Sequence, residues 1–275
     1  MTSFLLTAHT DILESLRAKW FLAYSLIFGS LVALLFMFGL TESRIMGFTG
    51  LSRLMVTYIQ LAMAILPLFV LLTTVRSVAG DREAAVYEYL LSLPIGLAPW
   101  FWGKLAGRFL IVFLPVFLAM LGAVVWGVLK GADIPWALFT YYTGLLMALA
   151  WCFLGIGMLL STLSRSADVA QASAFVIWLT LLLFLDLILL GVMIREYLPP
   201  ESAVAIALVN PLQVFRTAAM LLLDRQLVML GPSAYVILDN FGEVGYITYA
   251  LLYPTLLGTL CAVGGYLIFR RSDLP

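Results

Sequence analysis

This chain has 275 residues, of which 64% are hydrophobic and only 11% are charged, and its formal net charge is zero. Soluble domains are about half apolar and a quarter charged, so the composition predicts an integral membrane protein. The zero net charge argues against a nucleic-acid-binding surface. Cys152, Cys261 and the single histidine, His9, lack the spacing of metal ligands, so we expect no metal site and no cofactor in this chain.

The N-terminal residues 1–19 mix charged and apolar positions, a pattern that predicts an amphipathic elbow helix along the membrane surface. This stretch is a poor signal peptide, because the apolar run after it is too long and no small-residue cleavage site closes it. Residues 20–40 and 54–75 are long and apolar enough to form two membrane spans, and the second tolerates its internal Pro67.

Residues 76–104 form the longest polar interruption in the first half of the chain. Within this loop, residues 81–91 predict a short amphipathic helix. Such a helix suits contact with a soluble partner, although the same pattern also fits a helix that only lies on the lipid. Trp100, Phe101 and Trp102 would mark the membrane interface before the next span. The side chains expected to meet a partner are Asp81, Arg82, Glu83, Tyr87 and Glu88.

Four further spans are predicted at residues 105–129, 136–163, 169–194 and 246–269. Gly103 and Gly107 form a G-x-x-x-G pattern at the start of the first of these, which favours close helix packing. Asp186 is the one carboxylate deep inside a span, where a charge costs several kcal/mol, so it is a candidate functional residue. The alternative is a protonated Asp186 that bonds to a neighbouring helix or to a second copy of the chain.

The largest segment between spans, residues 195–245, contains a helix start at Asn210-Pro211, an N-cap residue followed by proline. We expect this helix to run through Leu223 or slightly further. It either lies flat on the outer leaflet or forms a gate or a docking surface for a partner, and we leave both open. The residues that would form the gate or dock are Asn210, Pro211, Phe215 and Arg216.

The distribution of Lys and Arg predicts the orientation of the chain. With six spans both termini share one side, and nine of the 15 basic residues fall on that side. Both termini are therefore expected in the cytoplasm, together with residues 76–104, and residues 195–245 are expected outside.

Motifs for chemistry are missing from the sequence. The only Gly-Lys pair, Gly103-Lys104, has no glycine at the spacing of a nucleotide-binding loop and is followed by Leu105. A lone histidine far from any serine or cysteine partner gives no catalytic triad. Transport or scaffolding remains as the class of function, and we expect no enzyme activity in this chain.

Several stretches together resemble the permeases of the ABC-2 exporter family, and more closely the NosY-type permeases. The stretches are LRAKW before the first span, GDREAAVYEYLLSLPIG and GK after the second, FLDL in the fifth, NPLQVFR in the outer segment and FRRSD at the C-terminus. The family pattern after the acidic pair is usually Gly-Thr, whereas this chain has Ala85 and Val86. Since alanine favours helix, this departure should leave the predicted helix intact.

The resemblance implies an all-α membrane protein with six transmembrane helices, an N-terminal elbow helix, a cytoplasmic coupling helix and a short extracytoplasmic helical segment. It is expected to form one permease domain over residues 1–275 in a bacterial inner membrane. The implied partners are a cytoplasmic ABC ATPase dimer that carries ATP and Mg²⁺, a second copy of this chain, a periplasmic accessory protein and membrane lipid. Asp81, Glu83 and Glu88 would face the ATPase, whose closure would push the second and third spans.

The NosY-type likeness implies a role in maturing the copper sites of nitrous oxide reductase, by moving a copper or sulfur species or by acting mechanically on a periplasmic partner. Two alternatives stay open at the level of sequence. One is an ABC-2 exporter of another substrate, such as a lipid or a drug. The other is a membrane scaffold without a transport cycle, which predicts no matched ATPase.

Overall fold

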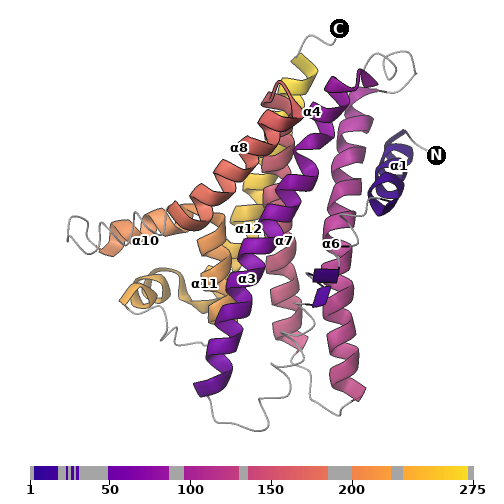
Figure 1. Cartoon of the computed structure of the whole chain (residues 1–275). Coiled ribbons are helices and arrows are strands. Elements are labelled where there is room, and N and C mark those ends of the chain that lie inside the picture. Colours follow the sequence, from indigo (N-terminus) through magenta and orange to yellow (C-terminus); the bar gives the residue numbers. More distant parts are fainter. Residues whose placement is uncertain are drawn as a thin grey trace.

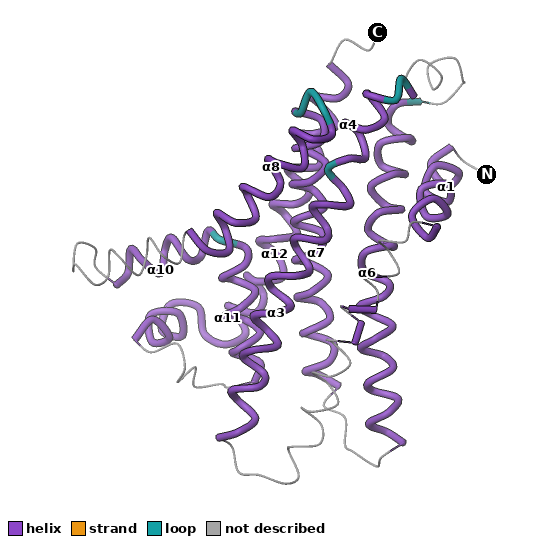
Figure 2. Tube along the Cα trace, viewed as in Figure 1, coloured by secondary structure: helices purple, strands orange, loops and turns teal. Residues whose placement is uncertain are grey.

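The computed structural model describes residues 3–17, 23, 26, 27, 29, 30, 49–86, 96–129, 136–184, 200–223 and 232–271. Within these residues the regular structure is entirely helical (Figure 1, Figure 2). The predicted first span, residues 20–40, lies almost wholly outside them. Asp186 also lies outside the described residues, so its role stays a prediction.

Four helices among the described residues are long and apolar enough to cross a membrane: Ile59–Glu83, Leu97–Gly122, Trp136–Leu163 and Asp239–Arg271. They belong to α3 (Thr49–Thr74) with α4 (Arg76–Glu83), α6 (Leu97–Leu129), α7 (Trp136–Leu163) and α12 (Pro232–Arg271). A shorter apolar helix, α8 (Ala167–Leu179), continues into the π-helical turn η1 (Thr180–Phe184). The membrane class is thus supported by four spans, whereas the count of six remains a prediction.

The predicted and observed bounds of the spans agree for one helix and differ for another. The predicted span 136–163 and helix α7 coincide. Helix α6 begins at Leu97 rather than near residue 105, so Trp100 and Phe101 lie inside the helix. Both rings are buried, and they stack on Phe269 of α12 with centroids 5.3 and 5.9 Å away. These two side chains therefore pack in the core and do not mark the membrane interface as predicted.

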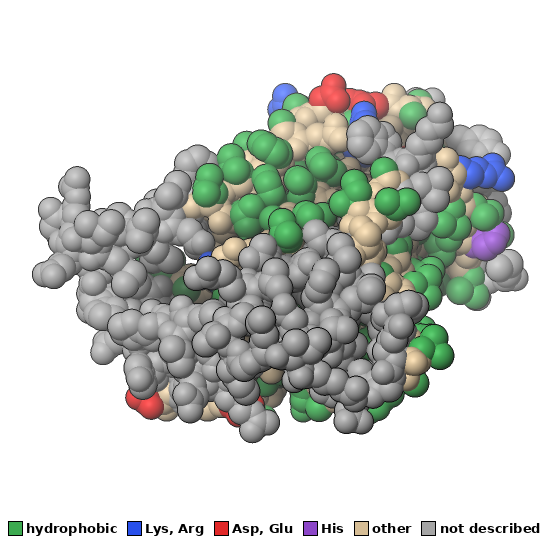
Figure 3. Space-filling model, turned by 60° about the horizontal axis from the view of Figure 1, so that its bottom comes forward, with side chains coloured by type: hydrophobic (Ala, Val, Ile, Leu, Met, Phe, Trp, Pro, Cys, Tyr) green, Lys and Arg blue, Asp and Glu red, His purple; other side chains and the backbone are tan. Residues whose placement is uncertain are grey.

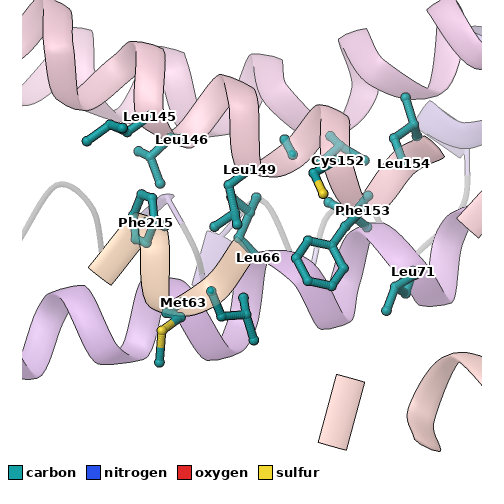
Figure 4. Packing of buried hydrophobic residues seen from close by; sticks show 14 of the residues in the cluster. Met63, Leu66, Leu71, Leu145, Leu146, Leu149, Cys152, Phe153, Leu154 and Phe215 are labelled. Atoms are coloured by element: carbon teal, nitrogen blue, oxygen red, sulfur yellow. The ribbon is translucent and has the colours of Figure 1, made fainter. Parts of the chain in front are cut away.

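Helix α7 lies at the centre of the bundle, against α3, α11 (Pro211–Leu223) and α12 (Figure 1). Its side chains Leu145, Leu149 and Phe153 are almost fully buried and pack toward α3 and α11 (Figure 4). A face of apolar side chains this broad is typical of a helix enclosed by others. On the face drawn in Figure 3, most of the described side chains are hydrophobic and the charged ones lie mainly at the margins, as expected for a surface that meets lipid.

Glycines bring α7 and α12 into backbone contact. A Cβ on Gly155 would lie 1.9 Å from the carbonyl oxygen of Gly258, and one on Gly258 would lie 2.6 Å from that of Trp151. Further along, a Cβ on Gly265 would come within 3.2 Å of the Leu159 Cα. Small residues let membrane helices approach closely and pack well. Among the described helices, α7 and α12 form the most extensive contact.

Part of the segment 195–245, which is predicted to lie outside the membrane, packs against the bundle. It contains α10 (Pro200–Val209), which the sequence did not predict, and α11, which begins at Pro211 as predicted. Apolar side chains on both sides of α11, among them Val214, Phe215 and Ala218, are at most 1% exposed. The expectation of a helix lying flat on the outer leaflet is therefore wrong, because α11 packs against α3, α7 and α12.

Helix α1 (Ser3–Arg17), which is predicted to be an elbow helix, lies along α6, next to the two glycines of α6 (Figure 1). A Cβ on Gly103 would lie 2.7 Å from the Phe4 carbonyl oxygen, and one on Gly107 would lie 3.0 Å from that of Ala8. The predicted close packing at the G-x-x-x-G pattern is confirmed, and its partner is α1. Apolar side chains of α1, including Leu5 and Leu13, remain exposed on other sides.

Candidate functional site: the junction around α4

Helix α4 lies at one end of the bundle, where α6 and α8 begin and α7 and α12 end (Figure 1). It follows α3 with only Val75 between them. We call the polar contacts that surround it the α4 junction, formed by Ser77, Asp81, Arg82, Glu83, Lys104, Ser161 and Ser164. Each of the three charged side chains of α4 that the sequence analysis selected reaches a different helix, as described next.

Asp81 forms an ion pair with Lys104 of α6. The Lys104 ammonium group also donates a hydrogen bond of 2.7 Å to the Ser77 carbonyl oxygen and lies 4.8 Å from the centre of the Trp100 ring. Lys104 is only 7% exposed, so water has little access to replace these partners. A buried charge that loses its partner costs several kcal/mol, which makes this pair a strict constraint on where α4 sits against α6.

Ser161 of α7 provides a cap for α4. Its hydroxyl oxygen accepts hydrogen bonds from the backbone N–H groups of Val78 (2.9 Å) and Ala79 (3.0 Å). Val75, at the start of α4, makes no side-chain cap of its own. N–H groups in the first turn of a helix need such an acceptor. Because Ser161 is fully buried, its hydroxyl fixes the first turn of α4 to α7 without help from water.

Arg82 and Glu83 hold the connection between α7 and α8. The Arg82 guanidinium donates to the carbonyl oxygens of Ser164 (3.0 Å) and Thr162 (3.4 Å) at the end of α7. The Glu83 carboxylate accepts a hydrogen bond of 3.0 Å from the Ala167 N–H at the start of α8. A cation at a helix C-terminus and an anion at an N-terminus both complement the helix dipole. The two side chains therefore join α4 to two helices at once.

A second charged contact joins α1 to α6. Arg108 Nε lies 3.1 Å from Asp11 Oδ1 and 3.0 Å from Oδ2, and its guanidinium donates to the Thr73 carbonyl oxygen at 2.9 Å. Asp11 is 3% exposed. Burial raises the pKa of Asp11 above its usual value, although the positive charges of Arg108 and Lys104 act in the opposite direction. The end of α3, α6 and α1 thus meet at Arg108.

The helix predicted over residues 81–91 is wrong in its start and in its continuity. The helix starts earlier, at Arg76, and ends at Glu83. Ala85 then has a positive φ of 54° in the turn that follows. Alanine at this position therefore does not extend the helix, contrary to the expectation drawn from the Ala85-Val86 departure. Tyr87 and Glu88 lie outside the described residues, so their part in the site stays a prediction.

The residues predicted for an outer gate or dock lie inside the bundle. Asn210 caps α11, accepting a hydrogen bond of 3.0 Å from the Leu212 N–H. Asn210, Pro211 and Phe215 are buried, and Phe215 lies against Tyr142 of α7. Arg216 is partly buried. Three of these four side chains offer no open surface within the described part of this chain, and their predicted part in a gate or dock stays a prediction.

The similarity of the chain to known proteins agrees with this geometry. A family model described as ABC-2 family transporter protein matches residues 5–274. This chain belongs to the ABC-2 transporter family. Among curated relatives, the probable ABC transporter permease protein NosY of Pseudomonas aeruginosa is 27% identical over 221 residues, covering 76% of this chain and 78% of the relative. The protein of the same name from Stutzerimonas stutzeri is 28% identical over 217 residues, with the same coverage.

In this ABC-2 permease, several residues of the α4 junction were missed by the sequence analysis. Lys104 was considered only for a nucleotide-binding loop and for orientation, Arg108 was counted only for orientation, and Ser161 was not considered. The two cations could have been found, because charges at the start of an apolar helix need partners. Ser161 gave no such sign, since a serine in an apolar run is also a common packing residue.

Among the described residues, no group of three or more potential metal ligands occurs.

Proposed function

We propose that this ABC-2 permease converts motion of a separate cytoplasmic ATPase into export or force transmission across the bacterial inner membrane. The ATPase dimer would bind at the α4 junction and carry ATP and Mg²⁺. The permease would act as a homodimer with both termini in the cytoplasm, bounded by membrane lipid. The observation that carries this proposal is that α4 is bonded to α6, α7 and α8 through separate side chains.

Such bonding is what a transmitting element requires. A push on the exposed turn at Ala84 and Ala85 would displace three packed helices together, because the hydrogen bonds from α4 to α7 and α8 are 2.9–3.4 Å long and most side chains of the α4 junction are buried. Packed cores have discrete arrangements and transmit strain rather than absorbing it. A helix that only rested on lipid would not need a buried lysine and a buried serine to hold it.

For the biological role, we propose that the permease serves the maturation of the copper sites of nitrous oxide reductase, which is the role that the resemblance to NosY-type permeases implies. The similarity to the two relatives named NosY supports this resemblance. A periplasmic accessory protein would then be the second partner. Loss of this permease from its host should leave nitrous oxide reductase protein present but short of copper. If the copper content is unchanged, the cargo assignment is wrong and an ABC-2 exporter of another substrate takes its place.

The test of the central proposal is co-purification of the tagged permease from its host in mild detergent, followed by site-directed cross-linking. In a background with Cys152→Ala and Cys261→Ala, a cysteine at Ala84 should cross-link to the ATPase. A cysteine at Trp136 is the control, because it lies at the other end of α7, about 40 Å away. If no ATPase accompanies an intact dimer, or if only the Trp136 position cross-links, the proposal fails and the scaffold interpretation replaces it.

A further inference from the structure

Two tyrosine hydroxyls of α12 bond to the end of α10. Tyr249 donates to the Leu208 carbonyl oxygen at 2.8 Å, and Tyr253 donates to that of Val209 at 2.5 Å. The two rings stack, with centroids 5.3 Å apart and planes 10° from parallel. The last carbonyl groups of a helix lack partners within it, and leaving them unbonded in an apolar region is costly. The tyrosines therefore supply donors where α10 needs them.

The residue that follows, Asn210, fixes the other side of the same bend. Its side-chain N–H group donates a hydrogen bond of 2.7 Å to the Leu181 carbonyl oxygen in η1. A π-helical turn is rare and often occurs at functional positions. Helices α10 and α11, which we call the α10–α11 hairpin (residues 200–223), are thus held at their bend by α12 and by η1. Helix α12 is kinked at Gly242, and Tyr249 lies about 10 Å further along it. At the bend the Asn210 side chain is buried, whereas the Val209 side chain is exposed.

Helix α12 is in turn joined closely to α7. Their backbones touch at Gly155 and Gly258, and the Trp151 indole N–H donates to the Thr259 hydroxyl oxygen at 3.0 Å. Backbone contact leaves no flexible side chain between the two helices that could absorb a displacement. At its far end, α7 carries Ser161, the buried cap of α4. The contacts therefore run without interruption from α4 through α7 and α12 to the hairpin.

We propose that Tyr249 and Tyr253 are positioning residues that couple the α10–α11 hairpin to α4 through the α7–α12 pair. This rests on the proposed function, and it adds a route to it: motion that enters at α4 reaches the end of α10 through α7 and then α12, whereas α11 also packs directly against α3 and α7. The hydroxyl groups transmit the displacement, because they are the polar contacts through which α12 holds the end of α10.

The test is hydrogen–deuterium exchange of residues 205–212 in the permease–ATPase complex in lipid nanodiscs, with and without a non-hydrolysable ATP analogue. In the wild type, the analogue should change the exchange rate of this segment. The double variant Tyr249→Phe with Tyr253→Phe keeps both rings and removes both hydroxyls. Its exchange at residues 205–212 should be about tenfold faster or more, and should no longer respond to the analogue.

Tyr266→Phe is the matched control, since it removes a hydroxyl from the same helix near Phe101, far from the hairpin. It should leave both the exchange rate and the response to the analogue as in the wild type. The proposal is overturned if the wild-type segment does not respond to the analogue, or if the double variant still responds. If no ATPase binds, the proposed function fails by itself, and the nucleotide-free exchange rates still decide whether the tyrosines hold the hairpin.

Discussion

At the scale of single residues, Asp81, Arg82 and Glu83 were selected from the sequence as contacts for a partner protein. In the structure each of them bonds to another helix of the same chain. Their placement on one helix at the end of a span was predictable from charge and period. Their partners were not, because Lys104, Ser164 and Ala167 are brought near only by the packing of α6, α7 and α8. Charge–dipole contacts of this kind contribute about 0.3–1 kcal/mol each, up to about 2 kcal/mol when partly buried.

Asp11 is predicted to make the stability of the permease depend on pH. Because the folded state raises its pKa above the usual 3.8, the contribution of Asp11 to stability is fully present below 3.8 and is lost as the pH rises through the raised pKa. Asp11→Asn mimics the neutral form at every pH. The melting temperature of Asp11→Asn minus that of the wild type should therefore increase as the pH rises from about 4 to 7.5, measured by thermal unfolding in detergent.

The control for this experiment is Asp168→Asn, which removes an almost fully exposed carboxylate, 3.9 Å from Arg76. An exposed ion pair of this kind contributes little, so this variant reports the general effect of removing one negative charge. If the melting temperature of Asp11→Asn minus that of the wild type instead decreases as the pH rises, the ion pair with Arg108 stabilises the charged Asp11 by more than burial destabilises it.

At the scale of elements, α4 ends where helix propensity alone predicts that it continues. Alanine is the best helix former, so residues 84–86 gave no sign of a break. The structure places Ala85 at φ 54°, a conformation that costs an L-residue about 1–2 kcal/mol and glycine almost nothing. The Gly-Thr pattern expected of the family at these positions now has a physical reason. A glycine there suits the turn that follows the helix.

Ala85→Gly is accordingly predicted to stabilise the permease by about 1 kcal/mol, since it relieves the positive φ. Ala84→Gly is the matched control in the same turn, because Ala84 has an ordinary φ of −81°. That change should be neutral or destabilising by up to about 1 kcal/mol. Denaturant unfolding of the two purified variants would compare them, and equal effects would contradict the strained turn.

Element starts with side-chain caps were the most predictable. Asn210-Pro211 opens α11 as expected, and the Asn210 side chain makes the bond that the pattern requires. The burial of α11 was not predictable, because the helix carries the polar residues Gln213 and Thr217. Both are at most 7% exposed, and Thr217 bonds to the Tyr246 side chain of α12. Hydrogen bonds between helices allow polar side chains inside a bundle, and the sequence does not show where such partners lie.

At the scale of the whole molecule, length and composition predicted the class of protein and most of the described spans, because hydrophobic length is set by the bilayer. They did not predict which helices touch. The pairing of α7 with α12 depends on Gly155 of α7 facing Gly258 and on Gly265 facing the Leu159 backbone. Many glycines in apolar helices have no such partner. Gly122, for example, has no atom within 4 Å of the position of its missing Cβ.

Gly258→Ala is predicted to destabilise the bundle by about 3 kcal/mol, because its Cβ would lie 2.6 Å from the Trp151 carbonyl oxygen and 2.7 Å from the Cys152 Cα. Gly264→Ala is the control on the same helix, since its nearest neighbour would be the Leu159 Cδ1 at 3.8 Å. That change should alter stability by no more than about 1 kcal/mol. Melting temperatures of the two variants in detergent would test the pair, and similar losses would contradict backbone contact at Gly258.

The glycine contact between α7 and α12 also has a consequence for how the permease is made. Helix α7 ends at Leu163 and α12 ends at Arg271, so the ribosome must add roughly 100 further residues before the contact can close. At 5–20 residues per second this takes roughly 5–20 s. During that interval α7 is already in the membrane, but the side of α7 that contains Gly155 is not yet covered by α12. A chain that stops before α12 therefore lacks the neighbour around which its core is built.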